Sequence, residues 1–190
     1  EENDECFVAV RSSATTEDLA DASFAGQQDT FLNVRGKENL LENTKKCMSS
    51  LFTPRAIFYR QKKGFDHSKA YLAVVVQKMV NSVKSGVMFS KNPTKNDGRI
   101  IIEAVWGLGE GIVSGKIKPD HYEVGEDLDN FEIEIIEINM KKMAIIRNKE
   151  GNNEEIKLGY EQAKKRVLDN YEIKRLAQYG RQLEEHYNKP

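Results

Sequence analysis

Short apolar runs dominate the chain and predict a fold built mainly from strands. Each run is four to seven residues long and is bounded by Gly, Asn, Ser or charged residues, as is typical of strands. The runs occupy residues 7–10, 30–34, 72–76, 85–90, 100–106 and 120–124. The continuous β-branched run at 72–76 indicates a strand buried on both faces, paired with 85–90 through a turn at 81–84. Residues 131–158 alternate between apolar and polar positions, which predicts a polar-faced antiparallel meander.

Helical spacing of apolar residues appears in three other segments. The pattern predicts a helix over 38–52 and another over 54–63, with Thr53 as N-cap and Pro54 in the first turn. Apolar residues recur every three or four positions again near the end of the chain, which predicts a helix over 161–187. Together these elements predict an α+β fold with mainly antiparallel strands and flanking helices.

Composition limits the classes of protein to which this chain can belong. Its 190 residues, 39% hydrophobic and 31% charged, are typical of one globular domain. A net charge of −1 gives no basic field for nucleic acid or a membrane surface, and no apolar run approaches the roughly 20 residues of a transmembrane helix. Cys6 and Cys47 form neither a metal-spaced cluster nor a disulfide framework, which favours a reducing, cytoplasmic setting. The chain begins at Glu1 without methionine, which indicates a fragment of a longer protein.

The stretch from Phe7 to Thr30 carries the clearest candidate chemistry. A short apolar strand is followed directly by Arg11 and then by a run of serines and threonines, and a small-residue turn containing Gly26 comes next. An arginine fork matches phosphate oxygens, and small residues allow backbone N–H groups to approach a polyanion. The same residues also suit an ordinary polar loop in which Ser13 or Asp18 caps a helix, so the pattern leaves both interpretations open.

Three further features carry weaker signals. The strand end at 77–80 can offer backbone groups to an adenine edge, although an ordinary strand end has the same pattern. The GxGxG run at 107–111 follows a strand, but no crossover helix of a βαβ unit plainly follows it. Glu103 and Glu110 are candidate buried carboxylates, and each could equally pair with a nearby Lys or Arg. His67, His121 and His186 lack partner Cys or Asp clusters, so none indicates a zinc ligand or a general base.

Several motifs, in order, resemble a known nucleotide-binding domain. They cover nearly the whole chain and read VRSSATTEDL, SFAGQQDTFLNV, KKCMSSLFTPRAIFYR, GFDHSKAYLAVVVQKMV, SGVMFSKNP, WGLGEGIVSGKIKPDHYEV and GRQLEEHYNKP. The chain is similar to the AMP/ATP-binding domain of the phosphoenolpyruvate synthase and pyruvate phosphate dikinase family, which the rifampicin phosphotransferases share. The resemblance implies an ATP-grasp architecture, with residues 1–190 forming one such domain, truncated at both ends.

The resemblance also implies a reaction and a set of site residues. In the family, this domain passes phosphoryl groups from ATP, with Mg²⁺, to a histidine on a separate swivelling domain. The synthase converts ATP, pyruvate and water into AMP, phosphoenolpyruvate and phosphate. By motif match, Arg11 would hold the ATP phosphates and is the one catalytic candidate. Gly26 and Thr30 would belong to the loop that closes over the phosphates. The adenine hinge would comprise Gln77, Lys78, Met79 and Val80. Glu103 and Glu110 stay possible acidic site residues on the sequence pattern alone, outside this motif match.

The chain departs from the family pattern at both ends. A glycine-rich segment with a lysine precedes this region in the family, and segments of the type DIEW and VQxRP follow it and supply the metal ligands. We therefore expect an active phosphotransferase as the full-length parent, no metal ligand within residues 1–190, and no catalysis by the isolated chain. An antibiotic phosphotransferase of the rifampicin type and a non-catalytic nucleotide-binding module are the alternatives.

Overall fold

The computed structural model describes residues 6–14, 18–19, 22–23, 29–95, 97–125 and 132–190. The chain divides into two compact units, residues 1–80 and residues 81–190. Both units combine helices with strands that pair antiparallel within each sheet, so the predicted α+β class with mainly antiparallel strands is confirmed.

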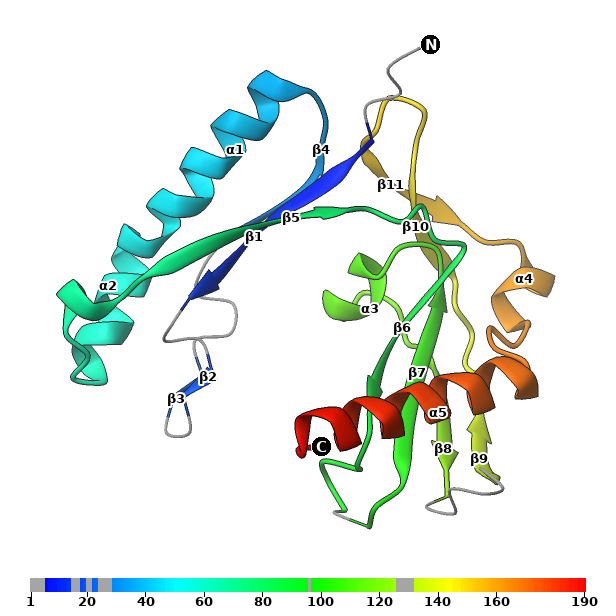
Figure 1. Cartoon of the computed structure of the whole chain (residues 1–190). Helices are drawn as coiled ribbons and strands as arrows, with labels where there is room; N and C mark the ends of the chain where they lie inside the picture. The colour runs from blue at the N-terminus through cyan, green and yellow to red at the C-terminus, as the bar shows by residue number, and fades with distance from the viewer. Residues whose placement is uncertain (1–5, 15–17, 20–21, 24–28, 96, 126–131) are drawn as a thin grey trace. The chain divides into compact units, whose positions relative to one another are not determined.

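The first unit is a three-stranded antiparallel sheet with helices on one face (Figure 1). The strand order is β4-β1-β5, and β2 and β3 form a separate two-stranded hairpin. The strands are β1 (Val8–Ala14), β2 (Asp18–Leu19), β3 (Ala22–Ser23), β4 (Thr30–Val34) and β5 (Leu72–Lys78). The helices are α1 (Lys37–Ser49), η1 (Ser50–Phe52), α2 (Pro54–Lys62) and η2 (His67–Lys69), which match the predicted segments 38–52 and 54–63.

A small apolar core joins α1 to the sheet. Its fully or nearly fully buried members are Val10, Val34 and Cys47, with Val8, Phe31, Leu40 and Val74 packed around them. Arg60 of α2 is also buried, and its Nη2 donates to the Leu51 carbonyl at 2.6 Å. As predicted, Thr53 caps α2, since its hydroxyl accepts from the Ala56 N–H.

Strand β5 corrects two predictions. It lies at the edge of its sheet, and Val75 and Val76 are 42% and 48% exposed, so it is not buried on both faces. It also does not pair with the following strand, because every residue from Leu72 to Lys78 is matched with β1. The β-branched run reflects strand propensity, which an edge strand satisfies as well as a central one.

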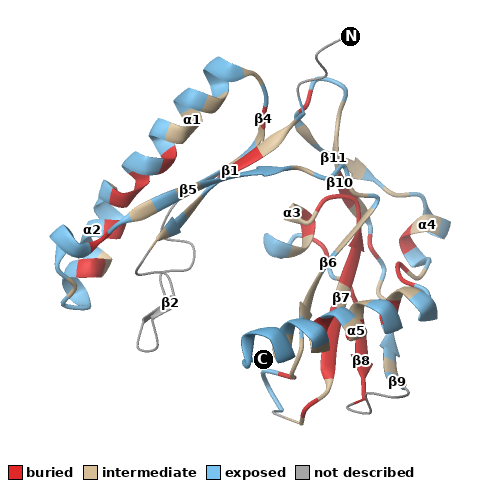
Figure 2. Cartoon of the chain, in the orientation of Figure 1, coloured by how far each residue is buried: buried red, intermediate tan, exposed pale blue. Residues whose placement is uncertain are grey.

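The second unit is a four-stranded antiparallel sheet covered on one face by a long helix (Figure 1). The order β6-β7-β8-β9 places the most apolar strand, β7, beside β8 in the middle of the sheet, and both are mostly buried (Figure 2). The strands are β6 (Lys84–Phe89), β7 (Ile100–Trp106), β8 (Asp120–Val124), β9 (Ile133–Glu137), β10 (Met143–Arg147) and β11 (Asn153–Lys157). The helices are α3 (Glu110–Val113), α4 (Tyr160–Lys164) and α5 (Asn170–Tyr187).

The predicted meander over 131–158 is wrong in its pairing. Strand β9 joins the four-stranded sheet beside β8, while β10 and β11 form a hairpin of their own. The connection between β9 and β10 is fixed by Asp120, which accepts the Asn139 N–H at 2.9 Å and the Lys141 Nζ at 2.5 Å. These contacts hold residues 139–141 against Asp120, so β10 does not fold back onto β9. The alternating sequence pattern contains no signal for such a long-range contact.

The predicted helix over 161–187 is also wrong, since it is interrupted between α4 and α5. Val167 and Leu168 are buried there, and their N–H groups donate to Asp120 and to the Tyr122 hydroxyl. Asp169 then starts α5 in a capping box with Glu172. Burial of two apolar residues and a strong N-cap together outweigh helical continuity.

Replacing Asp169 with alanine should lower the free energy of unfolding by about 1 kcal/mol, because the N-terminal N–H groups of α5 lose their acceptor. The matched control is Asp169→Asn, which keeps a side-chain oxygen and should stay within a few tenths of a kcal/mol of the original. Urea titration followed by circular dichroism measures both values. Equal stability of the two variants would contradict the capping role.

Candidate nucleotide-binding site

Arg11 and Thr30 are cross-strand neighbours in the first unit. They are paired in the register of β1 and β4, and on the other side of β1 Ala9 is paired with Gln77. Val8 and Val10 point toward the α1 core, so the alternation of the strand directs Arg11 to the opposite face. Directly opposed residues share a face, which places Arg11, Thr30 and Gln77 together on the side of the sheet that α1 does not cover.

Arg11 is exposed, and within the described part of the chain no hydrogen bond or ion pair involves its side chain. Gly26, the other residue predicted for phosphate binding in this stretch, lies outside the described residues. Arg11 and Thr30 therefore bring a cation and a hydroxyl to this face, a pair suited to an anion.

The predicted hinge at 77–80 continues the edge of the sheet. Met79 donates its N–H to the Phe7 carbonyl at 2.8 Å, which extends the β1–β5 ladder beyond Lys78. Backbone groups alternate in direction along an antiparallel pair, so the N–H and C=O of Lys78 point away from β1. Because β5 is an edge strand, this donor and acceptor lie on the open side of the sheet.

Met79 is itself held in place by its side chain. The N–H of Asn33 donates to Met79 Sδ at 3.0 Å, and Asn33 adopts a positive φ of 56° at the end of β4. This conformation is uncommon outside glycine and is tolerated by asparagine. The contact ties the end of β4 to the hinge and so fixes the exposed backbone edge relative to Arg11 within the same sheet.

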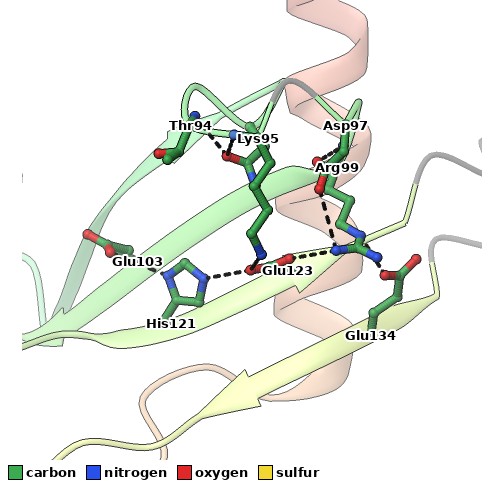
Figure 3. A network of polar contacts seen from close by, with 9 residues as sticks. Thr94, Lys95, Asp97, Arg99, Glu103, His121, Glu123 and Glu134 are labelled. Carbon is green, nitrogen blue, oxygen red and sulfur yellow. Dashed lines mark hydrogen bonds and ion pairs between the residues drawn. The ribbon is translucent and has the colours of Figure 1, made fainter.

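In the second unit, Glu103 belongs to a polar cluster on one face of the sheet (Figure 3). Its neighbours Ile102 and Ala104 pack in the core under α5, so Glu103 points to the opposite face. His121 is its cross-strand partner on β8, and the imidazole Nδ1 lies 3.4 Å from Glu103 Oε1. The carboxylate of Glu103 is 35% exposed, so it has both a protein partner and access to solvent.

The cluster continues from His121 to Glu123. The imidazole Nε2 lies 3.4 Å from Glu123 Oε1, and Lys95 and Arg99 also reach this carboxylate at 3.4 and 3.2 Å (Figure 3). Burial alone favours the neutral acid, but hydrogen bonds and charges from His121, Lys95 and Arg99 outweigh it and lower the pKa of Glu123. Glu123 is therefore a buried anion at neutral pH.

Glu110 has a different environment. It begins α3, and its carboxylate accepts a hydrogen bond from the side-chain amide of Asn153 on β11. The preceding glycine loop is pinned to β10, where the Leu108 N–H donates to the Ile145 carbonyl at 2.7 Å. Close packing requires Gly107, since a Cβ there would overlap the Ile145 carbonyl oxygen, and a Cβ at Gly111 would displace the end of the Ile117 side chain. The GxGxG run thus has a packing role in this unit.

The described residues do not fit a magnesium site. Among them no group of three or more His, Cys, Asp or Glu side chains is placed to hold a metal ion. Glu103 faces an imidazole and Glu110 an amide donor, and neither has a second carboxylate as co-ligand.

Among the described residues, no helix has the length and apolar character needed to cross a bilayer.

Sequence reasoning missed the cluster around His121. It treats the three histidines only as metal ligands or bases, whereas the partners of His121 are carboxylates on β7 and β8. His67 accepts a hydrogen bond from Arg60, and His186 packs edge-on against Tyr187. The alternation in 120–124 is the one available signal, because it separates the core positions of this strand from His121 and Glu123.

Helices packed on mainly antiparallel sheets agree with a nucleotide-binding fold of the ATP-grasp type, the class to which the matching family model belongs. The chain belongs to the family of the pyruvate phosphate dikinase AMP/ATP-binding domain, whose model matches residues 1–190.

Named relatives agree with this family. The chain is 52% identical to a probable phosphoenolpyruvate synthase of Methanocaldococcus jannaschii over 98% of its own length and 16% of the relative. It is 54% identical to a probable phosphoenolpyruvate synthase of Archaeoglobus fulgidus, over its full length and 25% of the relative. It is also 48% identical to the rifampicin phosphotransferase of Bacillus cereus, over 98% of the chain and 21% of the relative. The chain therefore spans a quarter or less of these relatives.

Proposed function

We propose that this chain is the ATP-binding part of a phosphoenolpyruvate synthase. The parent enzyme would convert ATP, pyruvate and water into AMP, phosphoenolpyruvate and phosphate through a phosphohistidine on a separate domain. The observation that carries the proposal is the sequence identity of 49–54% to several proteins named as phosphoenolpyruvate synthases or probable ones. Soluble, cytoplasmic metabolism leading toward gluconeogenesis is the setting that this reaction implies.

Within this function we assign the first unit to ATP recognition. Arg11 would bind the phosphate oxygens, because a guanidinium fork pairs with two oxygens at once. Thr30, its cross-strand neighbour, would add a hydroxyl, and Gly26 would let the loop approach the phosphates. The residues of the hinge, Gln77 to Val80, would meet the adenine edge, with the outward N–H and C=O of Lys78 as donor and acceptor.

Phosphoryl transfer depends on positioning and on neutralising charge rather than on a nucleophile from this domain. Arg11 supplies part of that positive charge. Mg²⁺ commonly supplies the rest in such reactions. The described residues do not fit a magnesium site, so we assign no metal ligand among them.

Replacing Arg11 with alanine should weaken ATP binding about 10- to 100-fold, as expected when one or two hydrogen bonds between charged groups are lost. Adenosine binding should change by less than about twofold, because adenosine carries no phosphate for the guanidinium to bind. Isothermal titration calorimetry on the chain, with ATP and adenosine as ligands, measures both affinities.

The matched control is Arg55→Ala, which removes an exposed arginine from α2 in the same unit. It should leave both affinities unchanged. An Arg11→Ala variant that binds ATP as tightly as the original would show that Arg11 has been wrongly assigned. Failure of the original chain to bind either ligand would instead contradict the assignment of ATP recognition to this domain.

A rifampicin-type phosphotransferase is the second candidate, supported by 45% and 48% identity to two proteins of that name. A non-catalytic nucleotide-binding module is the third possibility. The two enzymes differ in the acceptor of the phosphoryl group. An assay of the whole protein with ATP, and with pyruvate or rifampicin as acceptor, separates them, and turnover with neither acceptor would favour the non-catalytic module.

A further inference from the structure

Helix α1 presents two rows of side chains with different surroundings (Figure 2). The inner row packs on the sheet of the same unit, where Cys47 is fully buried and Leu40 lies beside it. The members of the outer row are exposed and recur every three or four residues, so they share one face of the helix. They are Lys37, Leu41, Lys45 and Met48, with Phe52 in η1 directly after α1.

The apolar members of the outer row are unusually exposed for their size. Leu41 and Met48 are each 53% exposed, and Phe52 is 64% exposed. A single exposed apolar side chain needs no explanation, but several along one row of a helix form a patch of the kind that marks an interaction surface. Since the inner row already anchors α1 to the sheet, folding of this unit leaves the outer row unused.

The spacing within the outer row indicates the shape of what it contacts. Leu41 and Met48 are seven residues apart, and so are Lys45 and Phe52. A repeat of seven is the spacing at which one helix packs along another. A helix that lies on a membrane instead has a broad apolar face with its lysines on the opposite side. Lysines alternate with apolar residues in the outer row, so a second helix fits this row better than lipid does.

Charge indicates the chemistry of that second helix. Residues 37–69 carry seven exposed Lys and Arg side chains against three acidic ones, although the whole chain has a net charge of −1. One of the three acids, Glu42, is already paired with Lys46 at 2.6 Å. Within the described part of the chain, neither Lys37 nor Lys45 has an ion-pair partner. A complementary surface therefore carries carboxylates opposite these two lysines.

We propose that the outer row of α1 is a docking surface for an amphipathic helix of a protein partner. Its apolar side chains would contact Leu41, Met48 and Phe52, and its Asp or Glu side chains would face Lys37 and Lys45. An apolar centre with charged groups at its rim is the usual composition of a protein interface. The proposal goes beyond ATP binding and is independent of it, because α1 packs on the sheet face opposite to Arg11.

A designed peptide tests the proposed chemistry directly. The probe is a fluorescently labelled helical peptide of leucine and glutamate, with all leucines on one face. It should bind the chain at least about tenfold more tightly than the same residues in an order that spreads the leucines around the helix. It should also bind about tenfold more tightly than the same helix with lysine in place of glutamate. Fluorescence anisotropy measures all three affinities.

Variants at exposed positions identify the surface that the peptide contacts. Leu41→Gln and Met48→Gln should each weaken binding of the acidic helix about five- to tenfold. Lys45→Glu should weaken binding of the acidic helix and strengthen binding of the lysine helix, because it reverses one charge of the outer row. The control is Val113→Gln, which removes an apolar residue that is 80% exposed on α3 and should change neither affinity. Circular dichroism checks that each variant is folded.

Nuclear magnetic resonance locates the peptide without any substitution. On addition of the acidic helix, the amide signals that shift should cluster within residues 37–52. No preference for the acidic helix over the other two peptides, or binding that Leu41→Gln and Met48→Gln leave unchanged, would overturn the proposal. Binding to phosphatidylserine vesicles or to an RNA oligonucleotide that these variants abolish, without binding of the acidic helix, would overturn it in favour of a lipid or nucleic-acid partner.

Discussion

Replacing Lys141 with methionine is expected to lower the free energy of unfolding of residues 81–190 by about 3–5 kcal/mol. The Lys141 and Asp120 side chains are both fully buried, and Nζ lies 2.5 Å from Asp120 Oδ1 and 2.9 Å from the Asn139 carbonyl. Methionine fills similar space but leaves the carboxylate of Asp120 buried without its cation. Removing one member of a buried pair is more damaging than the net strength of the pair suggests.

The hydrogen bonds of Asp120 explain why the loss of Lys141 should destabilise several elements of this unit. Its two oxygens also accept the N–H groups of Asn139 and Val167, so the pair joins β8, the β9–β10 connection and the segment before α5. Trp106 is the single tryptophan of the chain and lies in this unit, so its fluorescence during urea titration reports on unit 81–190. Lys142→Met, on the exposed neighbour, should change stability by less than about 0.5 kcal/mol. Equal stability of the two variants would contradict the role of the buried pair.

Replacing Gly107 with alanine should be nearly as damaging, with a loss of about 3 kcal/mol, the upper end of the cost of overpacking. Gly107 has a φ of +84°, and a Cβ there would overlap the carbonyl oxygen of Ile145. The variant therefore combines an unfavourable backbone conformation with a backbone overlap that no side-chain rotation relieves. Strand β10 would have to move away from the end of β7, to which it is bridged at this point.

Gly115→Ala is the matched control for this substitution. Gly115 has a similar φ of +69°, but a methyl group added at that position would have no other atom within 4 Å. This variant should lose about 1 kcal/mol of folding free energy, which is the cost of the unfavourable backbone conformation without any overlap. Denaturant titration of both variants measures the difference, and a difference near zero would mean that the contact with Ile145 has no energetic weight.

Local patterns in the sequence predict the elements well. The apolar runs at 30–34, 100–106 and 120–124 are strands in the structure, and Thr53-Pro54 begins a helix as expected. These signals are local because they depend on propensity, capping and side-chain alternation within a few residues. The helix predicted over 161–187 fails for the same reason, since the break depends on Asp120, more than forty residues away in the chain.

Local sequence patterns do not predict which distant segments pair with one another. Strand β5 pairs with β1, more than fifty residues earlier, and leaves its sequence neighbour β6 to a different sheet. The juxtaposition of Arg11 with Thr30, and of Glu103 with His121, depends on strand register, which no spacing in the sequence encodes. Motif resemblance named Arg11 and Thr30 as site residues, and the sequence pattern offered Glu103 as a candidate carboxylate, but neither indicated the imidazole that contacts Glu103.

The division of the chain into two contiguous units has a consequence for its synthesis. All strands of the first sheet, including the distant partners β1 and β5, lie within residues 1–80. A nascent chain therefore has every segment of that unit once Val80 has left the ribosome exit tunnel, before the second sheet has been completed. Domains fold as units during translation, starting from the N-terminus, so we expect the half that carries Arg11 and the hinge to acquire its structure first. The edge of β5 would then be exposed to other nascent chains until synthesis of the second sheet is finished.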